Sequence, residues 1–335
     1  MKISASLYSS KKRPLEPLIR ELDQCHIDLF HIDCNDDASV FEDIKEIRQI
    51  SETPIDIHII SDQPEQYFPQ IESMDLEYVT FQYENLKSKL IFPKAPNTRF
   101  GLAVTSDTPI EVFSEYADEC DFILIMTTTP GQSGGKFRKD NFKKIRKFRN
   151  AFPGKEIHVD GGVNHEVGFI LRMLGVHSVV SGSYLVNHDS IGAALLHLKS
   201  SSIHSDYQIK DFMIDRDDAP VLLEGSYGMK EIVQSIEDHS LGFTMIADVD
   251  GNLKGLSSNA DLRRGLLKHI DNLDILDVTD ILNESPVTIN ENATISELLD
   301  LIQHKQFLIS FLPVVNDQQK LTGALTFINL IRSES

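Results

Sequence analysis

Three short segments of the sequence each place a histidine and an aspartate two residues apart: His31-Ile32-Asp33, Asp56-Ile57-His58 and His158-Val159-Asp160. Residues two apart on a β-strand point to the same face, so both polar side chains of a segment can point to one side of a strand. Imidazole nitrogens and carboxylate oxygens that converge from three strands form a donor set suited to a divalent transition metal such as Zn, Fe or Mn. The sequence therefore predicts a metal site.

Pairs of small residues recur later in the chain, near the ends of β-rich runs. They are Gly134 and Gly135, Gly161 and Gly162, and Gly182 and Ser183. Backbone N–H groups that approach a ligand closely can hold a phosphate group without a nearby cation. We expect these pairs to bind the phosphate of a small phosphorylated substrate.

The elements that must position these residues alternate between β-rich runs and stretches with helical apolar spacing, such as 142–152 and 167–174. The predicted strands are 2–8, 27–33, 54–60, 77–82, 99–104, 121–127, 156–160 and 178–182. Eight β/α units in about 200 residues fit a closed (β/α)8 TIM barrel. Functional residues of such a barrel lie at the carboxyl ends of the strands.

The pattern changes after the small polar segment 200–205, which is typical of a linker. Beyond it, a unit in which a helix precedes two strands joined by a turn occurs twice, which indicates a tandem repeat. The predicted helices are 229–237 and 295–304, the first strands are 242–248 and 308–315, and the second strands begin at Gly255 and Gly323. We therefore predict two domains, a barrel over residues 1–203 and a smaller α+β tandem repeat over residues 204–335.

The composition limits the classes of partner. The formal net charge is −19, which argues against nucleic acid and anionic membranes, since both require a basic surface. No apolar run approaches the roughly 20 residues of a membrane span, and no apolar signal segment follows the N-terminus. The three cysteines form no CxxC pair, as in proteins of reducing compartments. We expect a cytoplasmic protein.

The barrel segment resembles the ribulose-phosphate 3-epimerase family from Lys2 to about Leu198. The resemblance rests on ISASL, LFHID, DIHII, GLAV, ILIMTTTPGQSGGKF, VDGGV and VVSGS, with the later motifs at the family's distances. It implies that the metal ligands are His31, Asp33, His58 and Asp160, and that His158 is not a ligand. It also implies that Ser6 and Met126 lie at the substrate.

The same resemblance implies an activity. Asp33 and Asp160 would act as the two acid/base groups of a 1,1-proton transfer at C3 of a keto-sugar phosphate such as ribulose 5-phosphate. The transfer would pass through an enediolate whose charge the metal stabilises. The expected protein is an enzyme of the isomerase class.

The sequence departs from the family pattern around the substrate. Asn35 and Asp37 stand where the family has Met and Gly, Ile60 replaces a Met, Gln82 replaces a His, and Gln132, Ser133 and Gly135 replace Phe, Gly and Gln. The segment between Asp33 and Asp56 is also shorter than in the family. The expected substrate therefore includes keto-sugar phosphates other than ribulose 5-phosphate. An alternative from another class is a non-catalytic or repurposed sugar-phosphate-binding or sensor protein regulated by a nucleotide.

Residues 207–332 resemble a CBS domain pair, a module that often binds adenosine or other nucleotides and often dimerises. The run GLSSNADLRR implies nucleotide contacts from Ser258 and Asp261, and Thr326 is the candidate in the second repeat. Asn329 replaces the ribose-binding aspartate of that repeat. We expect a regulatory CBS pair and a homo-oligomer, dimeric or higher, formed through the barrel, the CBS pair or both.

Overall fold

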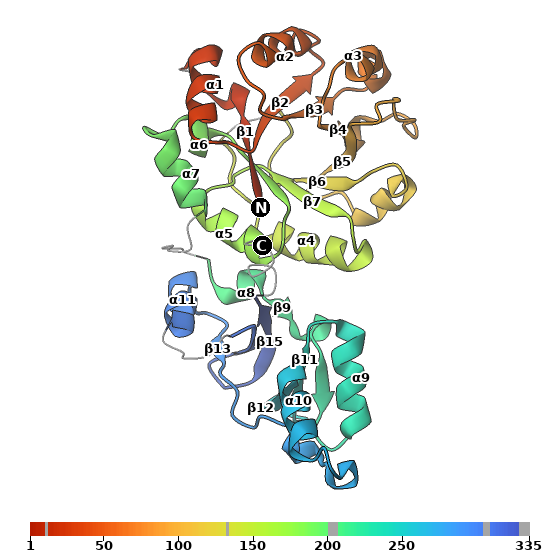
Figure 1. The fold of residues 1–335 in the computed structure, drawn as a ribbon, viewed down its shortest axis with the longest axis vertical. Helices are drawn as coiled ribbons and strands as arrows, with labels where there is room; N and C mark the ends of the chain where they lie inside the picture. Colours follow the sequence, from red (N-terminus) through yellow and green to blue (C-terminus); the bar gives the residue numbers. More distant parts are fainter. Residues whose placement is uncertain (11–12, 132–133, 200–206, 304–308, 328–335) are drawn as a thin grey trace. The chain divides into compact units, whose positions relative to one another are not determined.

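The computed structural model describes residues 1–10, 13–131, 134–199, 207–303 and 309–327. The chain splits into two compact units that divide between residues 203 and 204, and Figure 1 shows both as ribbons. The predicted linker 200–205 and three residues named above, Gln132, Ser133 and Asn329, lie outside the described residues.

The first unit is a closed barrel of eight parallel strands in sequence order, which confirms the predicted (β/α)8 architecture. The helices lie around the outside of the strands (Figure 1). The strands are β1 (Lys2–Ser6), β2 (Leu29–Asn35), β3 (Ile55–Ile60), β4 (Tyr78–Gln82), β5 (Arg99–Thr105), β6 (Phe122–Met126), β7 (Glu156–Asp160) and β8 (Ser178–Ser181). Their bounds are close to the predicted ones.

The helices that cover the barrel are α1 (Leu15–Gln24), α2 (Val40–Arg48), α3 (Phe68–Ser73), α4 (Asp140–Ala151), α5 (His165–Met173), α6 (Ser183–Val186) and α7 (Ile191–Lys199). Among the described residues they are accompanied by four 3-10 helices, η1 (Leu7–Ser9), η2 (Pro64–Tyr67), η3 (Tyr83–Asn85) and η4 (Ile110–Tyr116). The connections after β4 and β5 contain only η3 and η4, so two of the eight β/α units are reduced.

Side chains alternate along each strand between the barrel interior and the helix layer. On β3 the apolar Ile57 and Ile59 are as completely buried as their polar neighbours Asp56 and His58. A closed barrel covers both faces of a strand, so the apolar residues pack against helices while the polar residues line the interior. This explains why the sequence alternates although every residue of β3 is buried, and it places ionisable groups inside the barrel.

An aromatic layer in the barrel interior is formed by Tyr78 and Phe122, the first residues of β4 and β6, and by His158 in the middle of β7. The Phe122 ring stacks on His158 with 4.1 Å between centroids, and the Tyr78 ring lies 5.5 Å from that of His158. Gly101 makes room for this layer, since a Cβ there would lie 2.3 Å from the Phe122 ring. His158 Nε2 lies 3.4 Å from the Glu156 carboxylate. His158 is therefore a packed residue of the barrel floor.

The second unit contains two sheets, in the order β10-β11-β12 and β13-β14-β15-β9. Their antiparallel strand pairs have the same register, because Phe243 pairs with Ser258 in one and Phe311 with Thr326 in the other. The two equivalent phenylalanine rings stack at 4.4 Å. This repeat confirms the predicted tandem α+β module. Its helices and strands are α8 (Ile209–Phe212), β9 (Ile214–Asp215), η5 (Arg216–Asp218), β10 (Val221–Leu223), α9 (Met229–His239), β11 (Phe243–Ala247), β12 (Leu253–Ser258), α10 (Asn259–Lys268), η6 (Leu273–Ile275), η7 (Val278–Asp280), β13 (Ile289–Asn290), α11 (Ile295–Gln303), β14 (Phe311–Val315) and β15 (Leu321–Thr326).

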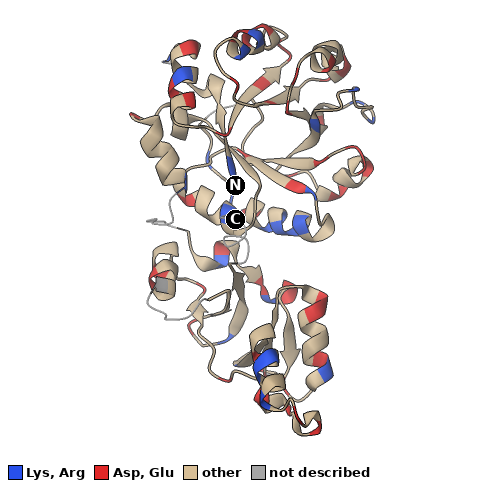
Figure 2. Cartoon of the chain, in the orientation of Figure 1, with Lys and Arg blue, Asp and Glu red and all other residues tan. Residues whose placement is uncertain are grey.

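Charged residues lie mainly on the helices and loops of both units, and α4 carries a dense run of lysine and arginine (Figure 2). One of these residues, Lys144, donates hydrogen bonds to the backbone oxygens of Thr105 and Thr108, so it holds the loop after β5. Within the described ranges, no helix has the length and apolar character needed to cross a membrane.

Candidate metal centre and active site

Four side chains meet at the carboxyl ends of three strands. His31 and Asp33 come from β2, His58 from β3 and Asp160 from β7, and one potential ligand atom of each lies within 4.8 Å of the others. The parallel register sets Asp33 directly beside His58. His31 Nε2 lies 3.3 Å from Asp33 Oδ1 and 3.9 Å from Asp160 Oδ2. The four predicted ligand residues thus lie together, while metal binding by them stays a prediction.

A buried carboxylate orients His31. Asp56 lies beside His31 in the register of β2 and β3, and its Oδ2 is 2.9 Å from His31 Nδ1 and 3.3 Å from the hydroxyl of Ser4. An ionised carboxylate only accepts hydrogen bonds, so Nδ1 carries a proton and Nε2 faces Asp33 and Asp160. Carboxylates commonly orient metal-binding histidines in this way. The sequence pattern places Asp56 on the face of His58, but it contains no local signal for the contact with His31.

An amide orients His58. Its Nε2 lies 2.8 Å from Gln82 Oε1, and since a carbonyl oxygen only accepts, Nε2 carries the proton. Nδ1 lies 3.3 Å from Asp33 Oδ1, yet it is buried without a hydrogen-bond partner among the described residues. A nitrogen lone pair and a carboxylate oxygen that face each other repel unless a cation lies between them. The donor set therefore fits a metal ion.

Burial and charge separate the pKa values of the two candidate acid/base groups. Burial raises the pKa of Asp160 to about 6, although the charge of His31 opposes the rise. Burial also acts to raise the pKa of Asp33, but the charge and hydrogen bond of His31 outweigh it and hold the pKa of this carboxyl well below its usual range. Burial disfavours a charged His31, yet Asp56 and Asp33 raise its pKa well above the ordinary value. In the metal-free protein these shifts favour an ionised Asp33 and a protonated His31.

Two other predicted substrate residues end strands that lie next to strands of the cluster, β6 beside β7 and β1 beside β2. Met126 ends β6, is fully buried and pairs in register with Asp160, so an apolar side chain lies beside that carboxyl group. Ser6 ends β1, is largely buried, and its hydroxyl lies 2.9 Å from the hydroxyl of Ser9. Gly182 lies against the same pair, since a Cβ there would be 2.4 Å from Ser9 Oγ.

The glycines after β7 pack directly against the loop after β6. Gly161 and Gly162 have φ of +108° and +63°, and a Cβ on Gly162 would lie 2.3 Å from the backbone nitrogen of Phe137. A Cβ on Gly161 would lie 2.4 Å from the hydroxyl oxygen of Thr128. The Thr127 hydroxyl donates to the backbone oxygen of Gly161 and ties the loops together. The two glycines therefore have a packing role whether or not they contact a ligand.

Replacing Gly162 by alanine is expected to destabilise the barrel more than the same change at Gly134. Both residues have positive φ, +63° and +88°, so both variants lose roughly 1–2 kcal/mol to backbone strain. Gly134 has no described atom within 4 Å of an added Cβ, whereas Gly162 meets backbone. We expect the melting temperature of the barrel to fall by about 10 °C for Gly162→Ala and about 3 °C for Gly134→Ala. Equal shifts in calorimetry without substrate would argue against the packing role.

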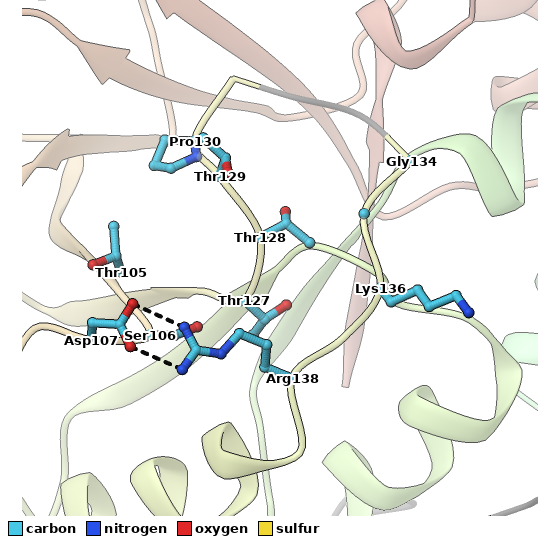
Figure 3. A pocket seen from close by; sticks show the side chains of 11 residues that line it. Thr105, Ser106, Asp107, Thr127, Thr128, Thr129, Pro130, Gly134, Lys136 and Arg138 are labelled. Atoms are coloured by element: carbon cyan, nitrogen blue, oxygen red, sulfur yellow. Dashed lines mark hydrogen bonds and ion pairs between the residues drawn. The ribbon is translucent and has the colours of Figure 1, made fainter.

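A cavity of about 620 Å³ opens beside the loop after β6 (Figure 3). Its lining consists of Thr105, Ser106, Asp107, residues 127–130, Gly134, Gly135, Lys136 and Arg138. Two hydrogen bonds of 2.9 Å join the Arg138 guanidinium to Asp107 in this lining (Figure 3). The other predicted phosphate residues, Gly161, Gly162, Gly182 and Ser183, are not among the described residues that line it. Of the six predicted phosphate residues, only Gly134 and Gly135 therefore line this cavity, and phosphate binding by the six stays a prediction.

The connection after β2 is short. Residues 36–39 alone separate the end of β2 from α2, and Asp36 has a positive φ of +53°. Asn35 is exposed and pairs in register with Ile60, and a Cβ on Gly131 would lie 3.5 Å from the side chains of both. Two of the side chains that depart from the family pattern therefore meet under the loop after β6, at the mouth of the barrel.

The two predicted nucleotide contacts in the first CBS repeat cap a helix. Ser258 precedes α10 and its hydroxyl accepts a hydrogen bond from Asp261 N at 3.3 Å, while the Asp261 carboxylate accepts one from Ser258 N at 3.0 Å. Such a capping box explains why both residues are buried without invoking a ligand. Thr326 ends β15 at the equivalent register. Nucleotide binding stays a prediction.

The model of the ribulose-phosphate 3 epimerase family matches residues 2–186, and the CBS domain model matches residues 278–335. A CBS-pair protein of known structure from Arabidopsis thaliana is 24% identical, with a TM-score of 0.31, over 39% of this chain and 95% of that chain.

Two curated relatives match about three fifths of this chain. Ribulose-phosphate 3-epimerase of Methanocaldococcus jannaschii is 27% identical over 233 residues, which cover 63% of this chain and 97% of the relative. The enzyme of the same name from Bacillus subtilis is 25% identical over 215 residues, 60% of this chain and 99% of the relative. Because the family model spans more than half of the chain and the relatives are matched over nearly their whole length, this protein belongs to the ribulose-phosphate 3-epimerase family, among the epimerases of the isomerase class.

Proposed function

We propose that this protein is a metal-dependent epimerase that inverts the carbon next to the carbonyl group of a keto-sugar phosphate such as ribulose 5-phosphate. The observation that carries the proposal is the approach of His58 Nδ1 to Asp33 Oδ1, two acceptor atoms 3.3 Å apart in a buried cluster. A proton on Nδ1 or a metal ion between the two atoms makes this arrangement favourable, and a metal ion is the partner that His31 and Asp160 can also bind. The names of the curated relatives support the substrate class.

Asp33 and Asp160 supply the two proton-transfer groups of the proposed reaction. One carboxylate takes the proton from the carbon next to the carbonyl group, and the electron pair of that C–H bond moves toward the carbonyl oxygen. The other carboxyl group returns a proton to the same carbon from the opposite face and gives the epimer. The pKa of Asp33 is held low and that of Asp160 is raised to about 6, so Asp160, whose pKa is the nearer to neutral pH, is the better suited of the two to take and return a proton. The roles exchange in the reverse direction.

The four residues of the cluster would hold a divalent metal such as Zn, Fe or Mn through two imidazoles and two carboxylates. Such an ion supplies positive charge that stabilises the negative charge on the substrate oxygens as the C–H bond breaks. Asp56 holds the His31 imidazole in a fixed orientation, and Gln82 does the same for the His58 imidazole. Met126 beside Asp160, together with the aromatic floor of the barrel, limits the access of water to the proton being transferred.

Metal binding at pH 7 is expected to release about one proton per ion. His31 carries a proton in the metal-free protein because its pKa is raised well above the ordinary value, and a ligand imidazole must lose that proton. Asp160, with its pKa at about 6, is mostly ionised at pH 7 and adds a second proton as the pH falls through 6. As the pH is lowered, metal affinity should therefore fall about tenfold per pH unit near neutrality and more steeply below pH 6.

Calorimetric titration with Zn²⁺ or Mn²⁺ in two buffers of different ionisation enthalpy measures this release. Proton release near one at pH 7 that rises toward two at pH 5.5 is the expected result. Proton-independent binding at both pH values would place the metal away from His31 and Asp160.

The proposed activity is tested with the full chain loaded with Zn, Fe or Mn and a panel of keto-pentose and keto-hexose phosphates. NMR of the products distinguishes the epimers at the carbon next to the carbonyl group. Conversion of at least one member of the panel, lost on chelation and regained on adding metal, is expected. Saturable binding of a sugar phosphate with no epimer from any member would instead favour a binding or sensor protein.

We further propose that the CBS pair regulates the enzyme through a nucleotide that contacts Ser258, Asp261 and Thr326. Ser258 and Thr326 end equivalent strands in the same register, so each repeat offers a hydroxyl at the same place. In thermal-shift measurements on the full chain, AMP or ATP should raise a transition temperature and Thr326→Val should reduce that shift at least about threefold. No shift with any adenosine nucleotide would contradict the proposal. The expected cytoplasmic location and homo-oligomer stay predictions.

A further inference from the structure

A chain of hydrogen bonds runs from the loop after β5 to His58. Glu84 accepts hydrogen bonds from the backbone nitrogen of Thr105, at 2.8 Å, and from the hydroxyl of Thr108. Its second carboxylate oxygen accepts one from the amide nitrogen of Gln82, whose amide oxygen lies 2.8 Å from His58 Nε2. Gln82 is 1% exposed, so water does not compete for its amide. The chain therefore links an anchored carboxylate to a buried imidazole.

The direction of each bond in this chain is determined by chemistry. A carboxylate only accepts, so the NH2 group of Gln82 must face Glu84 and its oxygen must face His58. An amide oxygen also only accepts, so the proton of a neutral His58 lies on Nε2. The lone pair of Nδ1 is then directed at the cluster, 3.3 Å from Asp33 Oδ1. With the amide reversed, its NH2 group would face Nε2, the proton would move to Nδ1, and that nitrogen could not bind a cation.

We propose that Gln82 and Glu84 are positioning residues that hold His58 as its Nε2–H tautomer, so that Nδ1 is ready to bind a metal. The inference rests on the proposed metal site. The two imidazoles of the cluster are thus oriented differently, His31 by the carboxylate of Asp56 in direct contact and His58 by a carboxylate that acts through a neutral amide. The relay transmits the orientation without placing another negative charge beside a cluster that already contains Asp33 and Asp160.

The variant Glu84→Gln tests the relay because an amide at position 84 can donate as well as accept, which removes the preference of the Gln82 amide for one orientation. Gln82→His, which keeps a ring nitrogen able to accept from His58, is the conservative variant and should retain the tautomer. Thr108→Val removes one of the two anchors of Glu84 and is a milder second variant if Glu84→Gln does not fold. Asp62→Asn, at an exposed carboxylate that pairs with Lys87, is the matched control.

Two-bond ¹H–¹⁵N correlation spectra of histidine-labelled, metal-free full chain report the tautomer, and titration with Zn²⁺ reports the affinity. We expect the Nε2–H tautomer of His58 in the wild type, Gln82→His and Asp62→Asn. In Glu84→Gln we expect a mixture of tautomers and at least about tenfold weaker Zn²⁺ binding, with a smaller change of the same kind in Thr108→Val.

An Nδ1–H tautomer in the wild type would overturn the proposal, whatever the activity of the enzyme. So would a tautomer or a Zn²⁺ affinity that is unchanged in Glu84→Gln. Failure of the proposed epimerase activity alone leaves the spectrum of the metal-free protein unaffected, so the two failures can be told apart.

Discussion

Asp33→Asn and Asp160→Asn should each reduce turnover of a keto-sugar phosphate by about 10²- to 10⁴-fold. Each variant removes one of the two groups that transfer a proton, and an amide can neither take nor return it. Each also replaces a carboxylate of the four-residue cluster, so metal affinity should fall as well. Assays at saturating metal, followed by elemental analysis of the assayed protein, separate the loss of proton transfer from the loss of metal.

The matched control for these variants is Glu16→Gln. Glu16 lies on α1, is exposed and pairs with Arg20 rather than with the cluster. Its removal should change turnover less than about threefold, because an exposed ion pair contributes little. Comparable losses in Asp33→Asn and Glu16→Gln would contradict the assignment of proton transfer to the cluster.

Asp56→Ala should weaken metal binding by about 10- to 100-fold and lower the stability of the metal-free barrel by about 3–5 kcal/mol. The carboxylate is buried and lies 2.9 Å from His31 Nδ1, so its removal leaves an imidazole without its partner. Burial lowers and Asp56 raises the pKa of His31, with a net rise. The stability from this pair is therefore complete below the unfolded pKa of about 6.5 and is lost as the pH rises through the folded pKa. In Asp56→Ala the pKa of His31 should be lower, so the loss of stability with rising pH should begin at a lower pH.

Ser4→Ala serves as the control for Asp56→Ala. The Ser4 hydroxyl lies 3.3 Å from the same carboxylate oxygen, so this variant removes one hydrogen bond and leaves the contact between Asp56 and His31 in place. A loss of about 0.5–1.5 kcal/mol in the free energy of unfolding is expected, with metal affinity nearly unchanged. Chemical denaturation of chelated protein between pH 5 and 9 measures the stabilities. If Asp56→Ala proved no more destabilising than Ser4→Ala, the carboxylate would not be the partner that orients His31.

The architecture and the core of the candidate site could be predicted because the local sequence of each barrel strand shows which side chains point into the barrel. Residues such as Asp56 and His58 alternate with isoleucines, and this alternation already shows which side chains share a face. The carboxyl end of each strand is where a barrel places its functional groups. His31, Asp33, His58 and Asp160 follow from these two rules and from the resemblance.

Contacts that depend on the register between strands could not be predicted. Asp56 lies 25 residues from His31 in the sequence, and their contact requires the alignment of β2 with β3. The relay from Glu84 to His58 likewise depends on how the loop after β5 folds back on β4. The phosphate prediction treated the glycines as ligand contacts, whereas Gly162 is also required by the close approach of Phe137.

The capping box of α10 shows a signal that was present in the sequence. Ser258 and Asp261 are three residues apart before an apolar stretch, which is the pattern of a helix N-terminus. Their hydrogen bonds to each other are therefore a local feature that the sequence predicts without reference to a nucleotide. The resemblance implies that these two side chains contact a nucleotide, whereas in the structure both cap the N-terminus of α10.

The most direct test of the account is solvent deuterium exchange at C3 of ribulose 5-phosphate, measured by NMR on one preparation of the full chain before chelation, after chelation and after metal is restored. Exchange reports removal of the proton even when the equilibrium favours the starting sugar. The account predicts exchange that chelation abolishes, that metal restores and that Asp33→Asn reduces at least about 100-fold. Binding of metal and sugar phosphate without exchange at C3 of this sugar or of any related keto-sugar phosphate would contradict it.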